Sequence, residues 1–129
     1  MTINAQRATT TSTIVDSYLA GYCEPDDQRR AELLSAAWAE DGRLIDPPLT
    51  GEGHAGIEAA ARALQQQFPG HRFRRTSGID AHHDQLRFGW ELVSPGGDVV
   101  LDGVDVGELA PDGRLRRIVG FFGSLSPAI

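Results

Sequence analysis

The stretch LRFGWELVSPGGDVVLDGVDVGEL, residues 86–109, decides the fold class of this chain. Apolar side chains alternate with polar ones or glycine over residues 86–92, and the alternation returns over residues 99–109. A period of two is typical of a half-buried β-strand. Residues 94–98 lie between the two runs and have the serine, proline, glycine and aspartate of a hairpin loop. The stretch therefore predicts two long antiparallel strands.

Extended segments flank this hairpin on both sides. On the N-terminal side, Phe73, Ile79 and Ala81 mark one long strand. On the C-terminal side, a turn at residues 110–113 leads into a last strand at residues 115–122. The second half of the chain is therefore predicted to form a four-strand antiparallel meander.

The chain begins with a polar segment and a first helix. Thr13 can cap this helix, in which Tyr18 and Tyr22 lie one turn apart on an apolar face. Residues 1–12 are too polar to be buried, so we expect them to form a flexible arm. Residues 13–129 are then expected to form a single domain.

Two more helices and a short strand pair precede the meander. The second helix begins after the acidic residues 26–27 and ends at residues 41–42, with an apolar stripe of Leu33, Leu34, Ala37 and Trp38. The third begins at His54 and ends before residues 69–70, with an apolar face of Ile57, Ala60, Ala61, Leu64 and Phe68. One short strand pair lies between these two helices. Helices that are segregated from an antiparallel sheet define an α+β fold.

The composition excludes several classes of protein. All twelve basic residues are arginine, against eighteen acidic residues, for a formal charge of −6. Without lysine there is no Schiff-base or Walker-type lysine. The acidic balance argues against nucleic acid and membrane surfaces as partners. No run approaches the roughly 20 apolar residues that span a bilayer, and the N-terminus lacks the pattern of a signal peptide, so we expect a cytoplasmic protein. The lone Cys23 excludes an intramolecular disulfide and a cysteine-rich zinc site.

Asp105 is an acidic residue in an apolar row of the predicted strand 99–109. Alternation places it on one face of the sheet between Gly103 and Gly107. Glycine weakens a strand, and a common reason for its presence is the close approach of a ligand or another backbone. Burial of Asp105 would raise the pKa of its carboxyl group, which could then stay protonated and donate a hydrogen bond. The alternative is that Asp105 is solvated and that the buried face is the opposite one, with Val100, Val104 and Val106.

Two further candidates lie in the first half of the chain. Asp46 precedes Pro47 and Pro48, which stiffen the backbone and help to position a general base. The alternative role for Asp46 is to initiate a turn. Tyr18 lies on the apolar face of the first helix, so its hydroxyl group needs a hydrogen-bond partner, either in the core or in a catalytic site.

Four segments taken together resemble the NTF2-like superfamily, and its SnoaL-like members in particular. They are WAEDGRLIDP at residues 38–47, GHAGI at 53–57, GVD at 103–105 and DGRL at 112–115, and the resemblance covers about residues 13–124. It implies a cone in which three N-terminal helices pack on a curved, mainly antiparallel sheet and enclose one apolar pocket. Because many members of the superfamily form dimers through the sheet, the resemblance also implies a homodimer.

Within the superfamily, the ketosteroid isomerases show the sharper likeness. Their base carboxylate lies in an Asp-Pro element after the second helix, where Asp46 stands, and their oxyanion tyrosine lies in the first helix, where Tyr18 stands. Their protonated aspartic acid lies on the third strand, where Asp105 stands. About four extra residues separate Tyr18 from Asp46 in this chain, which leaves Tyr22 as an alternative oxyanion donor. Polyketide cyclases of the SnoaL type also use a pocket acid, and the resemblance does not separate the two activities.

The hypothesis from sequence is a cofactor-independent enzyme that transfers a proton on a hydrophobic carbonyl substrate such as a steroid or a polyketide. Asp46 would remove a proton next to the carbonyl group, and Tyr18 and Asp105 would stabilise the enolate oxygen, so no metal or organic cofactor is needed. The residues expected to bind the substrate are Tyr22, Trp38, Phe68, Phe88, Trp90 and Phe121. The alternative is a non-catalytic protein that binds a small hydrophobic ligand, because one fold hosts many functions.

Overall fold

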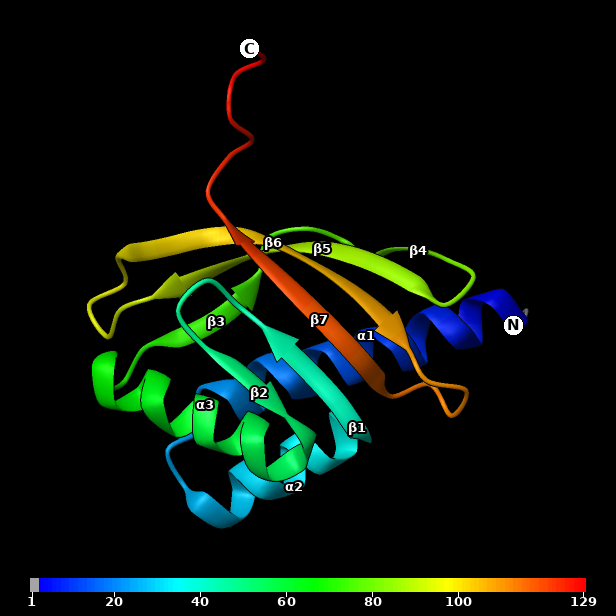
Figure 1. The fold of residues 1–129 in the computed structure, drawn as a ribbon, viewed down its shortest axis with the longest axis horizontal. Coiled ribbons are helices and arrows are strands. Elements are labelled where there is room, and N and C mark those ends of the chain that lie inside the picture. The colour runs from blue at the N-terminus through cyan, green and yellow to red at the C-terminus, as the bar shows by residue number, and fades with distance from the viewer. Residues whose placement is uncertain (1–2) are drawn as a thin grey trace.

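The computed structural model describes residues 3–129, which form three helices and seven strands (Figure 1). The helices are α1 (Ile3–Tyr22), α2 (Asp27–Ala37) and α3 (Gly53–Gln67). The strands are β1 (Trp38–Ile45), β2 (Thr50–Glu52), β3 (Arg72–Arg75), β4 (Asp80–His82), β5 (Gln85–Val93), β6 (Val99–Leu109) and β7 (Leu115–Phe122). The predicted bounds of the last two strands are confirmed.

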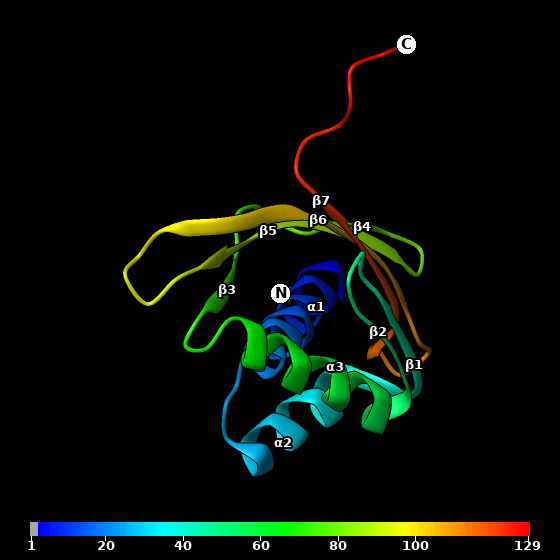
Figure 2. The same cartoon turned by 60° about the vertical axis from the view of Figure 1, so that its left-hand side comes forward.

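The strands form one sheet in the order β2-β1-β7-β6-β5-β3, and β4 also pairs with β5. β1 and β7 run parallel, whereas the other neighbours are antiparallel. The sheet curves over the three helices, and α1 lies along its concave side (Figures 1 and 2). This arrangement confirms the predicted α+β fold with its meander and its short pair of strands, β1 and β2.

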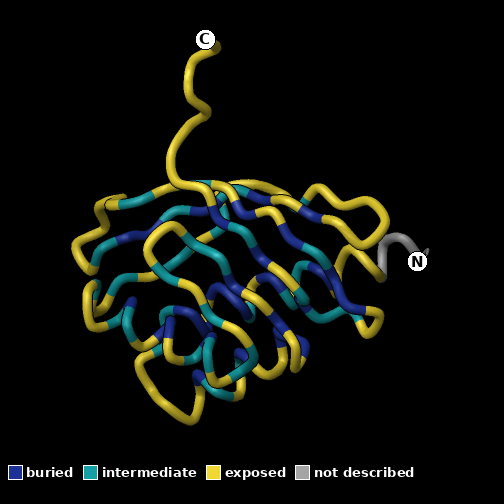
Figure 3. The backbone as a smooth tube through the Cα atoms, in the orientation of Figure 1, coloured by how far each residue is buried: buried dark blue, intermediate teal, exposed yellow. Residues whose placement is uncertain are grey.

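The core lies between the concave face of the sheet and the helices, where the buried residues gather (Figure 3). Helix α3 buries the face that its sequence predicts, through Ile57, Ala60, Ala61 and Leu64. Helix α1 contributes Val15, Tyr18, Leu19 and Tyr22. Because α1 is sandwiched in this way, its two tyrosines face the sheet rather than solvent.

A buried arginine fixes the connection between α1 and α2. The guanidinium group of Arg30 is 1% exposed and donates to the carbonyl groups of Glu24 and Pro25, at 3.0 and 3.3 Å. It also forms ion pairs with Asp27 and with Glu58 of α3. A buried charge is tolerated when it is paired and hydrogen-bonded in this way. These bonds tie the end of α1 to α3.

The helix start predicted at Thr13 is wrong. Helix α1 begins at Ile3, so the described part of the predicted arm, residues 3–12, extends the helix, and residues 1–2 lie outside the described residues. The hydroxyl group of Thr13 donates to the carbonyl group of Thr9 one turn earlier, rather than capping the helix. Arg7 donates to the carbonyl group of His83 between β4 and β5, so tertiary contacts support this first part of α1.

Trp38 lies in a strand and not, as predicted, in the second helix. Helix α2 ends at Ala37, and Trp38 has an extended backbone and pairs with Leu115 of β7. An aromatic residue suits a strand at least as well as a helix. Pairing with a distant strand therefore decides the conformation of Trp38.

The first strand of the predicted meander is interrupted at residues 76–79. β3 and β4 each pair with β5, and the amide of Thr76 donates to the carbonyl group of Gly89 at 2.9 Å. The amide of Gly89 then donates to the hydroxyl group of Ser77 at 2.8 Å. The prediction of one continuous strand is wrong because a side-chain oxygen replaces a carbonyl group of the ladder at this point.

Candidate functional site

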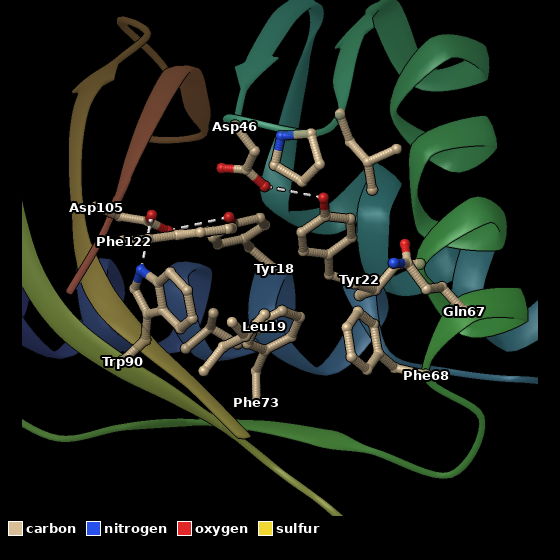
Figure 4. Close-up of a pocket in the computed structure, with 14 residues that line it drawn as sticks. Tyr18, Leu19, Tyr22, Asp46, Gln67, Phe68, Phe73, Trp90, Asp105 and Phe122 are labelled. Carbon is tan, nitrogen blue, oxygen red and sulfur yellow. Dashed lines mark hydrogen bonds between the residues drawn. The ribbon is translucent and has the colours of Figure 1, made fainter. Parts of the chain in front are cut away.

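A narrow cavity of about 30 Å³ lies between α1, α3, the turn after β1 and the concave face of the sheet (Figure 4). Its wall is mostly apolar, and the apolar members include Leu19, Leu64, Phe68, Phe73, Leu101 and Phe122. A few polar groups converge on this space, among them the carboxyl groups of Asp46 and Asp105. An apolar cavity with a small number of convergent polar groups is typical of a small-molecule site.

The sheet brings the two aspartates to either side of one glycine. Asp105 of β6 is paired directly with Gly120 of β7. The parallel pairing of β1 with β7 sets Ile45 opposite Val119, so that Asp46, the next residue, lies beside Gly120. Residues that are level on neighbouring strands point to the same face of a sheet. Both carboxyl groups therefore point into the cavity.

Asp105 is 2% exposed and accepts two hydrogen bonds at the floor of the cavity. The hydroxyl group of Tyr18 donates to Oδ2 at 3.0 Å, and the indole N–H of Trp90 donates to Oδ1 at 3.0 Å (Figure 4). The predicted inward orientation of Asp105 is confirmed. The alternative, a buried valine face, is excluded because Val104 and Val106 are exposed.

Gly103 makes room for the ring that bonds to Asp105. Trp90 of β5 is paired with Gly103 of β6, and a Cβ at position 103 would lie 2.7 Å from Cζ2 of Trp90. The sequence predicts a close approach to the glycines beside Asp105, and at Gly103 two groups approach: the backbone carbonyl oxygen of Phe121, which is the nearer, and this indole ring. Without a side chain at position 103, the ring of Trp90 can lie close to Gly103 while its N–H reaches the carboxyl group of Asp105.

Burial raises the pKa of Asp105 to about 7. The nearby charge of Asp46 also raises it, whereas the hydrogen bonds from Tyr18 and Trp90 favour the ionised form and lower it. Desolvation is the dominant cause, as the apolar surroundings predict. A carboxyl group with this pKa exchanges its proton readily near neutral pH, which suits acid–base chemistry.

Asp46 is half-buried and lies in the turn between β1 and β2. Its amide donates to the carbonyl group of Leu49 at 2.8 Å, which closes the turn, and Tyr22 donates its hydroxyl group to Oδ2 of Asp46 at 2.9 Å. Burial raises the pKa of Asp46, and the bond from Tyr22 lowers it. The sequence leaves open whether Asp46 initiates a turn or positions a carboxyl group in the site. In the structure it does both.

The two tyrosines come from successive turns of α1 and meet different aspartates. Residues four apart in a helix share a face, and the rings of Tyr18 and Tyr22 stack with centroids 5.9 Å apart. Burial raises the pKa of both hydroxyl groups far above the usual value for tyrosine, and the neighbouring carboxyl groups raise it further. Both tyrosines are therefore protonated hydrogen-bond donors. Tyr22 bonds to Asp46. The alternative role predicted for Tyr22, that of oxyanion donor, would instead place it beside Asp105.

The predicted substrate-binding residues divide into two groups. Those that line the cavity are Tyr22, Phe68 and Trp90, and those that do not are Trp38, Phe88 and Phe121. Trp38 and Phe88 are fully buried in the core. Trp38 packs edge-on against the ring of Tyr18, with centroids 5.5 Å apart, and so supports the cavity wall from behind.

The prediction for Phe121 is wrong in orientation. Phe121 is 58% exposed on the convex face, because it alternates along β7 with the inward-facing Gly120. Its neighbour Phe122 lines the cavity instead and contacts Trp90 edge-on, with centroids 5.7 Å apart. A regular count from the pair Leu109–Leu115 beside the turn points to Phe121, but an irregularity between Glu108 and Leu109 shifts the register by one residue and sets Phe122 opposite Gly103.

Gly120 is a further residue of the site that the sequence does not reveal. Its signal is the pairing of β6 with β7, which sets position 120 opposite Asp105. In the part of the chain that the structure describes, no three histidine, cysteine, aspartate or glutamate residues are grouped so that they could hold a metal ion. Over the same residues, no helix is both long and apolar enough to cross a membrane.

Among solved structures, the chain is similar to a candidate isomerase of the SnoaL-like family from Agrobacterium tumefaciens strain C58. The two are 44% identical over 90% of this chain and 99% of the other, with a TM-score of 0.83. This chain belongs to the SnoaL-like family. The SnoaL-like resemblance predicted from its sequence is confirmed.

Other SnoaL-like and NTF2-like proteins share the fold at lower identity. A candidate SnoaL-like polyketide cyclase from Jannaschia sp. CCS1 is 18% identical over 88% of this chain and 85% of the other, with a TM-score of 0.69. An NTF2-like protein of unknown function from Exiguobacterium sp. 255-15 is 17% identical over 88% and 100%, also with a TM-score of 0.69. They show that the fold is NTF2-like. No protein-family model and no curated protein sequence matches the chain.

Proposed function

We propose that this SnoaL-like protein is a cofactor-independent enzyme that transfers a proton on an apolar carbonyl substrate, by isomerase or cyclase chemistry. The observation that carries the proposal is the presence of two carboxyl groups with unlike surroundings in one apolar cavity. Asp105 is almost fully buried and accepts two hydrogen bonds, whereas Asp46 is half-buried and accepts one from a side chain. Pairs of titratable groups whose environments differ in this way are typical of acid–base sites.

In this proposal Asp46 is the general base. It is the more exposed of the two carboxyl groups, and its one side-chain donor bonds to Oδ2, so among the described residues no side chain donates to Oδ1. The ionised carboxyl group would take a proton from the carbon next to the substrate carbonyl and later return it to another carbon. Such proton transfers by a positioned side chain contribute about 10²- to 10⁴-fold to a rate.

Tyr18 and Asp105 would stabilise the enolate oxygen. Whether they can do so depends on whether Asp105 is protonated. When Asp105 is ionised, the hydroxyl proton of Tyr18 is used in the bond to Oδ2. When Asp105 is protonated, the pair has two protons, of which one joins the two groups and the other can be donated to a ligand. Binding of a carbonyl oxygen therefore favours the protonated pair, and affinity is expected to fall as the pH rises above the pKa of about 7.

The proposed role of Tyr22 is to hold the base. Its hydroxyl group bonds to Asp46 and its ring stacks on Phe73, with centroids 5.3 Å apart and planes 9° from parallel. The oxyanion role assigned to Tyr18 is supported by its bond to Asp105, which Tyr22 does not make. The flat aromatic wall supports a planar or fused-ring ligand such as a steroid or an aromatic polyketide.

A screen of steroids and aromatic polyketides tests this proposal, with binding measured as a thermal shift and turnover measured on β,γ-unsaturated and cyclisable ketones. We expect at least one ligand that the wild type both binds and converts, and that Asp46→Asn binds but converts at least 100-fold more slowly. The matched control is Asp98→Asn, an exposed aspartate in the loop between β5 and β6. Binding without turnover by the wild type would instead support the non-catalytic alternative.

We also propose that two copies pair through the convex face of the sheet. This face exposes an apolar group of side chains, Val100, Val104, Val106 and Phe121. Exposed apolar patches commonly mark interaction surfaces. Analytical ultracentrifugation is expected to find a dimer for the wild type and a monomer for Phe121→Glu, whereas a monomeric wild type would contradict the pairing.

A further inference from the structure

Gly120 occupies the middle of a row that Asp46, Gly120 and Asp105 form across β1, β7 and β6. A Cβ built on Gly120 would overlap Oδ1 of Asp46 and would lie 3.0 Å from Oδ1 of Asp105. Both carboxyl oxygens therefore use the space that any other residue would fill with a side chain.

The backbone at Gly120 does not itself require glycine. Five glycines of the chain have positive φ angles, and Gly120 is not among them. Its extended backbone is one that any residue adopts in a strand, where glycine is unfavourable. The space above Gly120 is thus the feature of its surroundings that excludes a larger residue.

We propose that Gly120 is a positioning residue, whose missing side chain lets Asp46 and Asp105 approach one another and bind a proton as a coupled pair. This inference rests on the proposed function for its consequence in catalysis, but the coupling itself is a property of the folded protein. The other titratable groups that face the pair are Tyr18 and Tyr22 of α1, and no arginine, histidine or lysine lines the cavity. No cation is therefore at hand to separate the two acids electrostatically.

A side chain at position 120 is expected to move the two carboxyl groups unequally. Asp105 is held in the middle of a strand by Tyr18 and Trp90, whereas Asp46 lies in a turn with one side-chain bond. The overlap is also the greater with Asp46. In Gly120→Ala, Asp46 should therefore turn toward the mouth while Asp105 stays in place.

A double-mutant cycle in thermal unfolding tests the contact. Gly120→Ala should lower the melting temperature of the wild type by several degrees, and should lower that of Asp46→Ala by less than half as much. The matched control is Gly78→Ala, because a Cβ at that exposed glycine meets nothing within 4 Å. An equal loss in both backgrounds, or failure to fold in both, would overturn the proposal, since the overlap with Asp46 would then not be the cause.

Carbon-13 NMR titration of the aspartate carboxyl groups tests the coupling, which a merely structural role for Gly120 would not change. In the wild type, Asp105 and Asp46 should titrate in two steps that belong to the pair. Asp46→Asn should lower the midpoint of Asp105 because a neighbouring charge has been removed, and Gly120→Ala should lower it in the same direction. A midpoint that does not change in either variant would contradict the coupling.

These two measurements do not depend on turnover. If no substrate is ever found but the cycle and the titration behave as described, the proposed function fails and the role of Gly120 stands. If a substrate is found, Gly120→Ala should lower kcat by about tenfold or more and change KM little, because the base is displaced while the binding wall is intact. Turnover with a normal kcat in Gly120→Ala would refute the positioning role alone.

Discussion

Two tyrosine–carboxyl pairs lie in the same cavity, and they differ in how each acid is held. In the inner pair, Asp105 lies in mid-strand, is almost fully buried and accepts bonds from Tyr18 and Trp90. In the outer pair, Asp46 lies in a turn, is half-buried and accepts one side-chain bond, from Tyr22. The same two functional groups therefore have different environments, and position in the fold, more than residue type, accounts for the difference.

The comparison shows how one cavity can provide two carboxyl groups with separate tasks. Desolvation raises the pKa of both, to about 7 for Asp105. The greater burial of Asp105 suits it to hold a proton, and the exposure of Asp46 suits it to accept one from a substrate. Changes to one pair should therefore have different effects from the same changes to the other.

The largest difference is expected from Asp46→Asn, which removes the proposed base and preserves its shape. The kcat value for a ketone substrate should fall about 10³-fold, with little change in KM, because an amide does not accept the proton. Steady-state kinetics and thermal-shift binding measure the two effects separately. A variant with more than a tenth of wild-type activity would remove Asp46 from the proposed role.

Asp105→Asn should show that the inner pair makes the free energy of unfolding depend on pH. The pKa of Asp105 is about 7 in the folded protein against an ordinary value of 3.8, so the folded state binds more protons between these values and stability falls as the pH rises through 7. The shift of roughly three pKa units corresponds to a loss of about 4 kcal/mol at pH 8 as an upper limit.

Asparagine resembles the neutral acid and avoids this loss. Urea unfolding at pH 5 and pH 8 should therefore show that Asp105→Asn gains up to about 3 kcal/mol relative to the wild type as the pH rises, because about two pKa units of the shift lie above pH 5. Asp98→Asn, in the exposed loop between β5 and β6, is the control. A difference between variant and wild type that is the same at both pH values would mean that Asp105 is not held neutral by burial.

Tyr18→Phe tests the donor of the inner pair. Loss of one preorganised donor to a developing oxyanion costs about 10²-fold in kcat. The bond from Tyr18 lowers the pKa of Asp105, so its removal should also raise the pH at which Asp105 ionises. If Tyr18→Phe lowers the rate by the same factor at every pH and leaves the midpoints of the pH–rate profile unchanged, Tyr18 has a purely structural role.

The smallest effect is expected from Tyr22→Phe, the matched change in the outer pair. Activity at pH 8 should fall less than tenfold, because Asp46 keeps its position in the turn. The bond from Tyr22 lowers the pKa of Asp46, so its loss should move the acid limb of the pH–rate profile to higher pH. If Tyr22→Phe proved more damaging than Tyr18→Phe, the roles proposed for the two tyrosines would have to be exchanged.

Local pattern was sufficient for much of the fold and for half of the site. Alternation over residues 99–109 placed Asp105 on the same face as Leu101 and Leu109 but left open which face is buried, and helical spacing placed Tyr18 and Tyr22 on one face of α1. Local pattern failed at Trp38 and at residues 76–79, where pairing with a distant strand or a side-chain hydrogen bond decided the conformation. The catalytic roles of Asp46, Asp105 and Tyr18 stay predictions.

The amino-acid order alone determined which side chains share a face, because backbone geometry repeats every two residues in a strand and every 3.6 in a helix. It did not determine which faces meet. The approach of Asp46 to Asp105 requires the parallel pairing of β1 with β7. Which aspartate each tyrosine bonds to depends on the position of α1 against the concave face of the sheet. Both depend on contacts between residues far apart in the chain, and only the packed tertiary structure brings those residues together.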